Sequence, residues 1–145
     1  MGASGERIGT DMTSKRMLKI LVAALGAVNL LTGLALLLAP LWFYENIGTY
    51  PPFNRHYAGD LGAYVLAIGI GLMWAARDPR QYRAVIAVAF LAGLFHTLNH
   101  IYDDVLVDAS LSKILQGAVL VGLETALLGL AWFLAERGRK AKSSK

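Results

Sequence analysis

Four long apolar segments dominate the pattern of the chain. Residues 20–44 carry no charged side chain, and 25 residues in a helix extend about 37 Å, which exceeds the roughly 30 Å hydrocarbon core of a bilayer. Three further apolar stretches follow, separated by polar turns. We therefore predict an all-α transmembrane bundle of four helices with antiparallel up-and-down connections. The helices are expected over residues 16–43, 56–76, 80–102 and 111–136.

The two ends of the chain differ from these segments in composition. Residues 1–15 are polar and rich in glycine, and residues 137–145 are basic, so we expect both to be disordered cytoplasmic tails. Pro40 is expected to end or bend the first helix, because proline lacks the N–H that a helix interior needs. A cleaved signal peptide is excluded because the first apolar run is too long and further spans follow.

Basic residues are distributed unevenly along the chain. Twelve of the 14 Lys and Arg residues lie in the first 19 residues, in residues 77–83 around the second loop, or in the last nine residues, while only Arg55 and Lys113 lie at the first and third loops. Cytoplasmic segments are enriched in Lys and Arg, so both termini are predicted to be cytoplasmic, in the plasma (inner) membrane. The basic residues flank apolar segments rather than forming a stripe, which argues against nucleic acid as a partner.

The composition limits the number of domains, the kinds of metal site and the partners that the chain can have. The chain has 145 residues, 56% of them hydrophobic, which suits one membrane domain. It contains no cysteine, so disulfides and thiolate metal sites are excluded. A lipid bilayer is therefore the expected partner, with a homo-oligomer or a larger membrane complex as a further one.

Two polar motifs lie at the same predicted depth on the outer side. His96, His100 and Asp103 stand at i, i+4 and i+7 near the end of the third helix, so they share one face. His56 and Asp60 share a face at the start of the second helix. Because these two helices are expected to be antiparallel neighbours, we predict that the imidazoles and carboxylates form one enclosure beneath the outer surface.

Such an enclosure suits several kinds of ligand. His56, His96 and His100 are candidate ligands for zinc, for iron or for a b-type haem. Without a metal, the histidines and Asp60 are candidate acids and bases acting on a lipid-soluble, quinone-like ligand. The alternative is that these groups hydrogen-bond to loop backbone and lipid headgroups. The residues expected to contact the bound cofactor or to orient the histidines are Tyr57, Tyr64, Asn99 and Asp103.

Glu124 lies near the middle of the fourth helix, and Asn29 is similarly deep in the first. We predict that the two pair near mid-membrane, with Glu124 protonated because a charged carboxyl is unfavourable in hydrocarbon. The functional interpretation is a catalytic carboxyl or proton relay at the floor of a cavity. The structural interpretation is an interhelical hydrogen bond. Gly26 and Gly33 share the face of Asn29, so another helix is expected to approach there closely.

Two segments resemble a known family. Residues 54–63 (NRHYAGDLGA) and 95–103 (FHTLNHIYD) are similar to small four-helix bacterial membrane proteins of the DoxX-like group. The likeness covers about residues 18–136, and it implies a role in membrane redox chemistry or beside an oxidoreductase, without implying a reaction. The matching positions are His56, Asp60, Gly62, His96, His100 and Asp103.

Two other functions are compatible with the sequence. A non-enzymatic accessory subunit of a larger membrane complex would use its glycine faces, Gly26/Gly33 and Gly62/Gly69, to contact other chains. A transporter for a small solute or a proton would use Glu124 and would need several copies to form a pathway. Whether the chain is an enzyme is left open by its residues.

Overall fold

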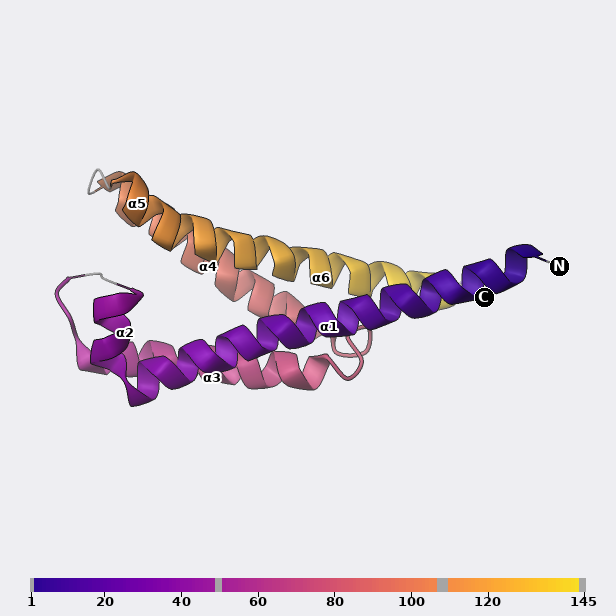
Figure 1. Ribbon diagram of the computed structural model, residues 1–145, viewed down its shortest axis with the longest axis horizontal. Helices are drawn as coiled ribbons and strands as arrows, with labels where there is room; N and C mark the ends of the chain where they lie inside the picture. The colour runs from indigo at the N-terminus through magenta and orange to yellow at the C-terminus, as the bar shows by residue number, and fades with distance from the viewer. Residues whose placement is uncertain (1, 49–50, 107–109, 144–145) are drawn as a thin grey trace.

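The computed structural model describes residues 2–48, 51–106 and 110–143, which are helical apart from short turns and loops (Figure 1). Four helical segments are long and apolar enough to cross a membrane: Met12–Leu38, Arg55–Ala75, Arg83–Leu106 and Gly117–Gly138. The all-α, four-span prediction is confirmed, and the chain is a multi-pass membrane protein. The elements are α1 (Gly2–Leu38), α2 (Pro40–Asn46), α3 (Arg55–Ala75), α4 (Arg83–Leu106), α5 (Leu111–Ile114), a π-helical turn (Leu115–Val119) and α6 (Leu120–Ser143).

Local sequence accounts for where these helices begin and end. α1 ends at Leu38, and Pro40 opens the short helix α2, so the predicted break at this proline is confirmed. Asn54 caps α3, because its side-chain oxygen accepts from the backbone N–H groups of His56 (2.9 Å) and Tyr57 (3.3 Å). Asp78 accepts in the same way from two backbone N–H groups in the turn before α4.

The outer bounds of the bundle differ from the prediction. α1 begins at Gly2 and α6 continues to Ser143, so both segments expected to be disordered tails continue the helices beside them. No proline interrupts either extension, and adding a residue to an existing helix needs no new nucleation.

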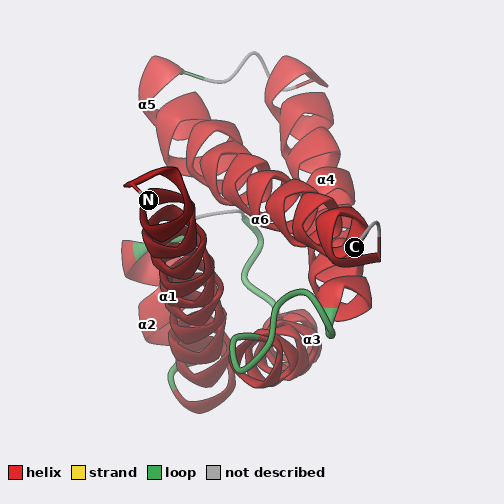
Figure 2. Ribbon diagram, turned by 90° about the vertical axis from the view of Figure 1, so that its right-hand side faces the viewer, coloured by secondary structure: helices red, strands yellow, loops and turns green. Residues whose placement is uncertain are grey.

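The four spans are arranged as two pairs, α1 with α3 and α4 with α6 (Figures 1 and 2). Glycines bring α1 and α3 into backbone contact. A Cβ atom on Gly33 would lie 2.5 Å from the Leu66 backbone nitrogen, and one on Gly69 would lie 2.6 Å from that of Leu30. Close approach at the glycines of α1 is thereby confirmed. The accessory-subunit interpretation is wrong on one point, because Gly26/Gly33 and Gly62/Gly69 pack within this chain rather than against another.

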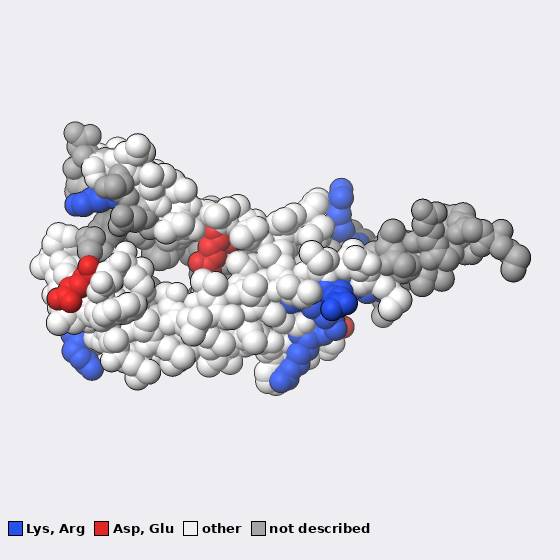
Figure 3. Space-filling view, in the orientation of Figure 1, with Lys and Arg blue, Asp and Glu red and all other residues white. Residues whose placement is uncertain are grey.

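The two pairs converge at the end where α1 begins and α6 ends, and they diverge toward α2 and α5 (Figure 1). An apolar core fills the convergent end, and the Arg83 side chain bonds Glu136 across α4 and α6 there at 2.8 Å. Basic side chains gather toward this end in Figure 3. The core residues are Leu18, Val22, Leu25, Leu72, Ala75, Ile86, Ala89, Leu128, Ala131 and Ala135.

α3 and α4 follow each other in sequence but do not pack along their length. α3 lies along α1 instead, and a close contact between α3 and α4 occurs near the turn that joins them, where Gly71 meets the side chain of Val85. The expectation that these two helices are close neighbours at their outer ends is therefore wrong. The physical reason is that α3 presents its glycines to α1, which allows a much closer approach.

The glycine contacts predict that two glycine-to-alanine substitutions in α3 differ sharply in their effect on stability. Gly69→Ala forces a Cβ against the Leu30 backbone and is expected to destabilise the protein by about 1–3 kcal/mol. Gly59→Ala is the matched control, because nothing lies within 4 Å of its Cβ position, and it should change stability by less than about 1 kcal/mol. The midpoint of SDS-induced unfolding measures both, and equal midpoints would contradict the packing described.

Candidate functional site

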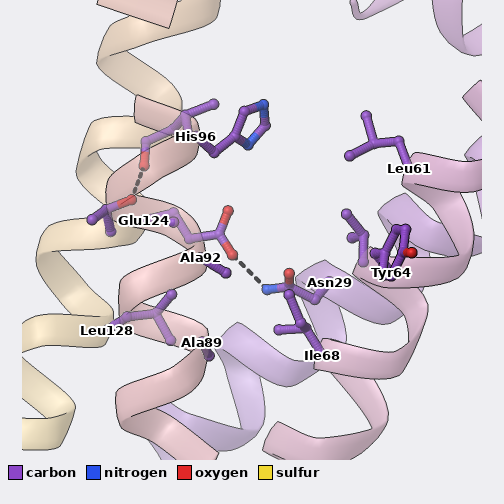
Figure 4. A pocket seen from close by; sticks show the side chains of 13 residues that line it. Asn29, Leu61, Tyr64, Ile68, Ala89, Ala92, His96, Glu124 and Leu128 are labelled. Atoms are coloured by element: carbon purple, nitrogen blue, oxygen red, sulfur yellow. Dashed lines mark hydrogen bonds between the residues drawn. The ribbon is translucent and has the colours of Figure 1, made fainter. Parts of the chain in front are cut away.

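A cavity of about 180 Å³ opens between the two helix pairs (Figures 3 and 4). Its wall comes from all four spans, with α3 on one side, α4 and α6 on the other, and Asn29 of α1 between them. The wall is predominantly apolar. The polar side chains that line it are Asn29, Tyr64, His96, Glu124 and Thr125.

Asn29 and Glu124 join the two helix pairs beside the cavity. The Asn29 side-chain nitrogen donates to Oε1 of Glu124 at 2.5 Å and to the Leu25 backbone carbonyl at 2.9 Å. Asn29 is buried, and Glu124 is partly buried. The predicted pairing of Asn29 with Glu124 is thus confirmed, and the bond spans the gap in Figure 4. A hydrogen bond at this depth satisfies two groups that hydrocarbon would leave unpaired.

A pair of threonines holds α4 against α6 below the cavity mouth. The hydroxyl oxygens of Thr97 and Thr125 lie 3.0 Å apart, and each hydroxyl also reaches a backbone carbonyl of its own helix. Gly93 allows this contact, since a Cβ there would lie 2.7 Å from the Thr125 hydroxyl. These threonines were not predicted as site residues. The signal for them is that Gly93 and Thr97 stand one helical turn apart on one face.

The predicted outer polar residues form three separate pairs, each within one helix. On α4, Nε2 of His96 lies 3.1 Å from Nε2 of His100, and the Asn99 amide donates to Asp103 at 3.1 Å. On α3, His56 lies 3.5 Å from Asp60, with 80% and 58% of the two side chains exposed. Of the three histidines, only His96 lines the cavity.

The enclosure predicted for these residues is not formed. His56, His96, His100, Asp60 and Asp103 all lie in the described part of the chain, which contains no group of three His, Asp or Glu side chains able to hold a metal ion. A zinc or iron site built from both helices, and a haem held between His56 and His96, required His56 beside the histidines of α4. It lies elsewhere because α3 packs on α1 and carries His56 to an exposed position.

Only one of the two tyrosines predicted to line a pocket does so. Tyr64 lies in the cavity wall, while Tyr57 does not and is 71% exposed beside the ring of His56. Asn99 is exposed and absent from the cavity wall, and so is Asp60. Of the predicted site residues, the structure therefore brings together Glu124, His96 and Tyr64, with Asn29 as the partner of Glu124.

Comparison of the chain with protein-family models, with curated proteins and with solved structures finds no match. The DoxX-like resemblance therefore stays a prediction.

The Asn29–Glu124 bond predicts non-additive effects on stability. Asn29→Leu leaves a carboxyl without its donor and should cost about 1–3 kcal/mol. Adding Glu124→Met removes the unpaired group and should restore most of the loss, since replacing both partners by apolar groups of similar shape is nearly neutral. SDS unfolding of the two single variants and the double variant measures the coupling. Asn99→Leu, which removes the exposed bond to Asp103, is the control and should have little effect; additive losses would contradict the coupling.

Proposed function

We propose that this protein binds a lipid-soluble ring compound of the quinone class in the cavity between its helix pairs. The observation that carries the proposal is one apolar cavity, within the membrane-spanning segments, that has a hydrogen-bonded acid–amide pair in its wall and an imidazole near its mouth. Ligand sites have this general composition, with mostly apolar walls and a few polar groups that fix orientation.

The size of the cavity supports a ligand of one ring. An engineered protein cavity of about 150 Å³ holds benzene, and this cavity measures about 180 Å³. It is open on one side, so an aliphatic tail can leave it along the diverging helices. A haem macrocycle is much larger than this space, which favours the quinone-like interpretation over the haem one.

The polar groups support a ligand with oxygen atoms on its ring. The Glu124–Asn29 pair lies deeper in the cavity than His96, and apolar Ile68, Ala89 and Leu128 line the space beyond the pair (Figure 4). A ring with two oxygen atoms therefore has polar partners at two depths. Ionisable side chains within a membrane span are unfavourable unless they serve a partner or a ligand. Glu124 and His96 line the open cavity, where a bound ligand can accept hydrogen bonds from them or donate hydrogen bonds to them.

Binding of a quinone probe tests this function. Duroquinone and its reduced form, duroquinol, would be titrated by calorimetry into the purified protein in detergent, with empty micelles as the blank. Saturable binding of at least one form is expected. His96→Ala should weaken it about fivefold to tenfold, as expected for one lost hydrogen bond, whereas His56→Ala, outside the cavity, should not.

A second test uses the space in the cavity and does not depend on hydrogen bonding. It compares one variant that fills the cavity with one that places the same side chain outside it. Ala92 lines the cavity, so Ala92→Phe is expected to abolish binding by occupying the space. Ala63→Phe places the same ring on an exposed position of α3 outside the wall and should bind as the unmodified protein does. No binding of either probe, or equal binding by the two variants, would contradict the proposed function.

We further propose that both chain ends are cytoplasmic, in the plasma membrane, which puts the wide end of the bundle on the opposite side. Support comes from the excess of Lys and Arg in the tails and the second loop. α1 begins and α6 ends at the same end of the molecule, as this orientation requires (Figure 1).

Cysteine labelling tests the orientation, because the chain has no cysteine of its own. Glu45→Cys places a thiol on the exposed surface near α2, and Gln81→Cys places one in the turn between α3 and α4. A membrane-impermeant maleimide applied to intact spheroplasts should label the first variant and not the second. Labelling of both should occur after the membrane is opened, and the reverse pattern in intact spheroplasts would invert the orientation.

A further inference from the structure

The side-chain nitrogen of Asn29 is fully hydrogen-bonded, so only its amide oxygen, an acceptor, is left to interact with a ligand in the cavity. An asparagine amide has two hydrogens on its nitrogen and an oxygen that accepts. The nitrogen is bonded to the Leu25 carbonyl and to Oε1 of Glu124. Within the described residues no donor reaches the amide oxygen, and Asn29 lies in the cavity wall.

Glu124 adds a second oxygen beside this acceptor. Its Oε1 accepts from Asn29, which leaves Oε2 for the cavity, and Figure 4 shows Oε2 and the amide oxygen on the same side of the pair, toward His96. If the carboxyl is charged, Oε2 only accepts; if it is neutral, a hydroxyl there both donates and accepts. Thr125 offers no donor, because its one hydrogen serves either the Val121 carbonyl or Thr97.

We infer that the ligand of this cavity carries a hydroxyl group that donates to the Asn29 amide oxygen, so that the hydroquinone form binds in preference to the quinone. The inference rests on the proposed function and specifies its ligand. A quinone oxygen only accepts, so it leaves the Asn29 oxygen unpaired in a water-poor site. A hydroxyl donates its one hydrogen to that oxygen, and its own oxygen can also accept from a neutral Glu124.

The other polar groups of the wall do not reverse this preference. His96 lies above the pair and Tyr64 on the opposite wall, and an imidazole or phenol can hydrogen-bond to a hydroxyl as well as to a carbonyl. They therefore serve both forms of the ligand. Discrimination between the forms comes from the Asn29 amide oxygen, which can only accept.

Duroquinol and duroquinone form a matched pair of probes, since they differ by two hydrogen atoms. We expect calorimetric titrations under anaerobic conditions to show duroquinol binding at least about tenfold more tightly, because a buried acceptor left unpaired is strongly unfavourable. Equal affinities, or tighter binding of duroquinone, would overturn this inference and leave the proposed function standing. Binding of neither probe would overturn both.

The double variant Asn29→Leu with Glu124→Met tests whether the wall causes the preference. It removes both polar groups of the pair, so no acceptor is left unpaired by a quinone and the affinity ratio should fall toward one. Asn99→Leu is the control, because the bond of Asn99 to Asp103 lies outside the cavity, and it should keep the ratio. An unchanged ratio in the double variant would overturn the assignment to this wall. The ratio in the unmodified protein decides the ligand form even if this variant does not fold.

Discussion

The hydrogen bond between Asn29 and Glu124 fixes how the two helix pairs stand relative to each other at mid-span. Polar groups in hydrocarbon are unfavourable unless they are bonded, so separating the pairs at this point would expose both partners. On one side of the bond the apolar core closes the bundle. On the other side the pairs diverge and the cavity opens. The bond thus lies where closed packing ends, which is why its two groups both join the helix pairs and line the cavity.

The pairing of the helices follows from what small residues permit. Between helices in a bilayer there is no hydrophobic driving force, so close van der Waals contact and hydrogen bonds decide which helices associate. α1 and α3 meet backbone to backbone at glycines, and α4 and α6 meet at Gly93 and at Gly129, where a Cβ would contact Phe90. α3 and α4 have no comparable seam along the described outer halves of the two helices. The cavity therefore forms because α1 packs closely on α3 and α4 packs closely on α6, whereas α3 and α4 make little contact with each other.

Features that depend on depth along one helix could be predicted from the sequence. The four spans, the break at Pro40 and the pairing of Asn29 with Glu124 all follow from how far each residue lies from a helix end. Which histidines lie together could not be predicted from the sequence, because that depends on which helices pack against each other. Depth placed His56 level with His96, but lateral neighbours are chosen by contact geometry, and helices adjacent in sequence need not be adjacent along their whole length.

The chain uses two kinds of polar contact between helices, and the difference bears on function. Thr97 and Thr125 link α4 to α6 through neutral hydroxyls that also satisfy backbone carbonyls. A neutral pair of this kind is enough to hold two membrane helices together. Where the cavity opens, the contact instead uses a carboxylic acid, whose ionised form is far less favourable in hydrocarbon. Holding the helices does not require that acid, and it is this group at the cavity wall on which the proposed binding function depends.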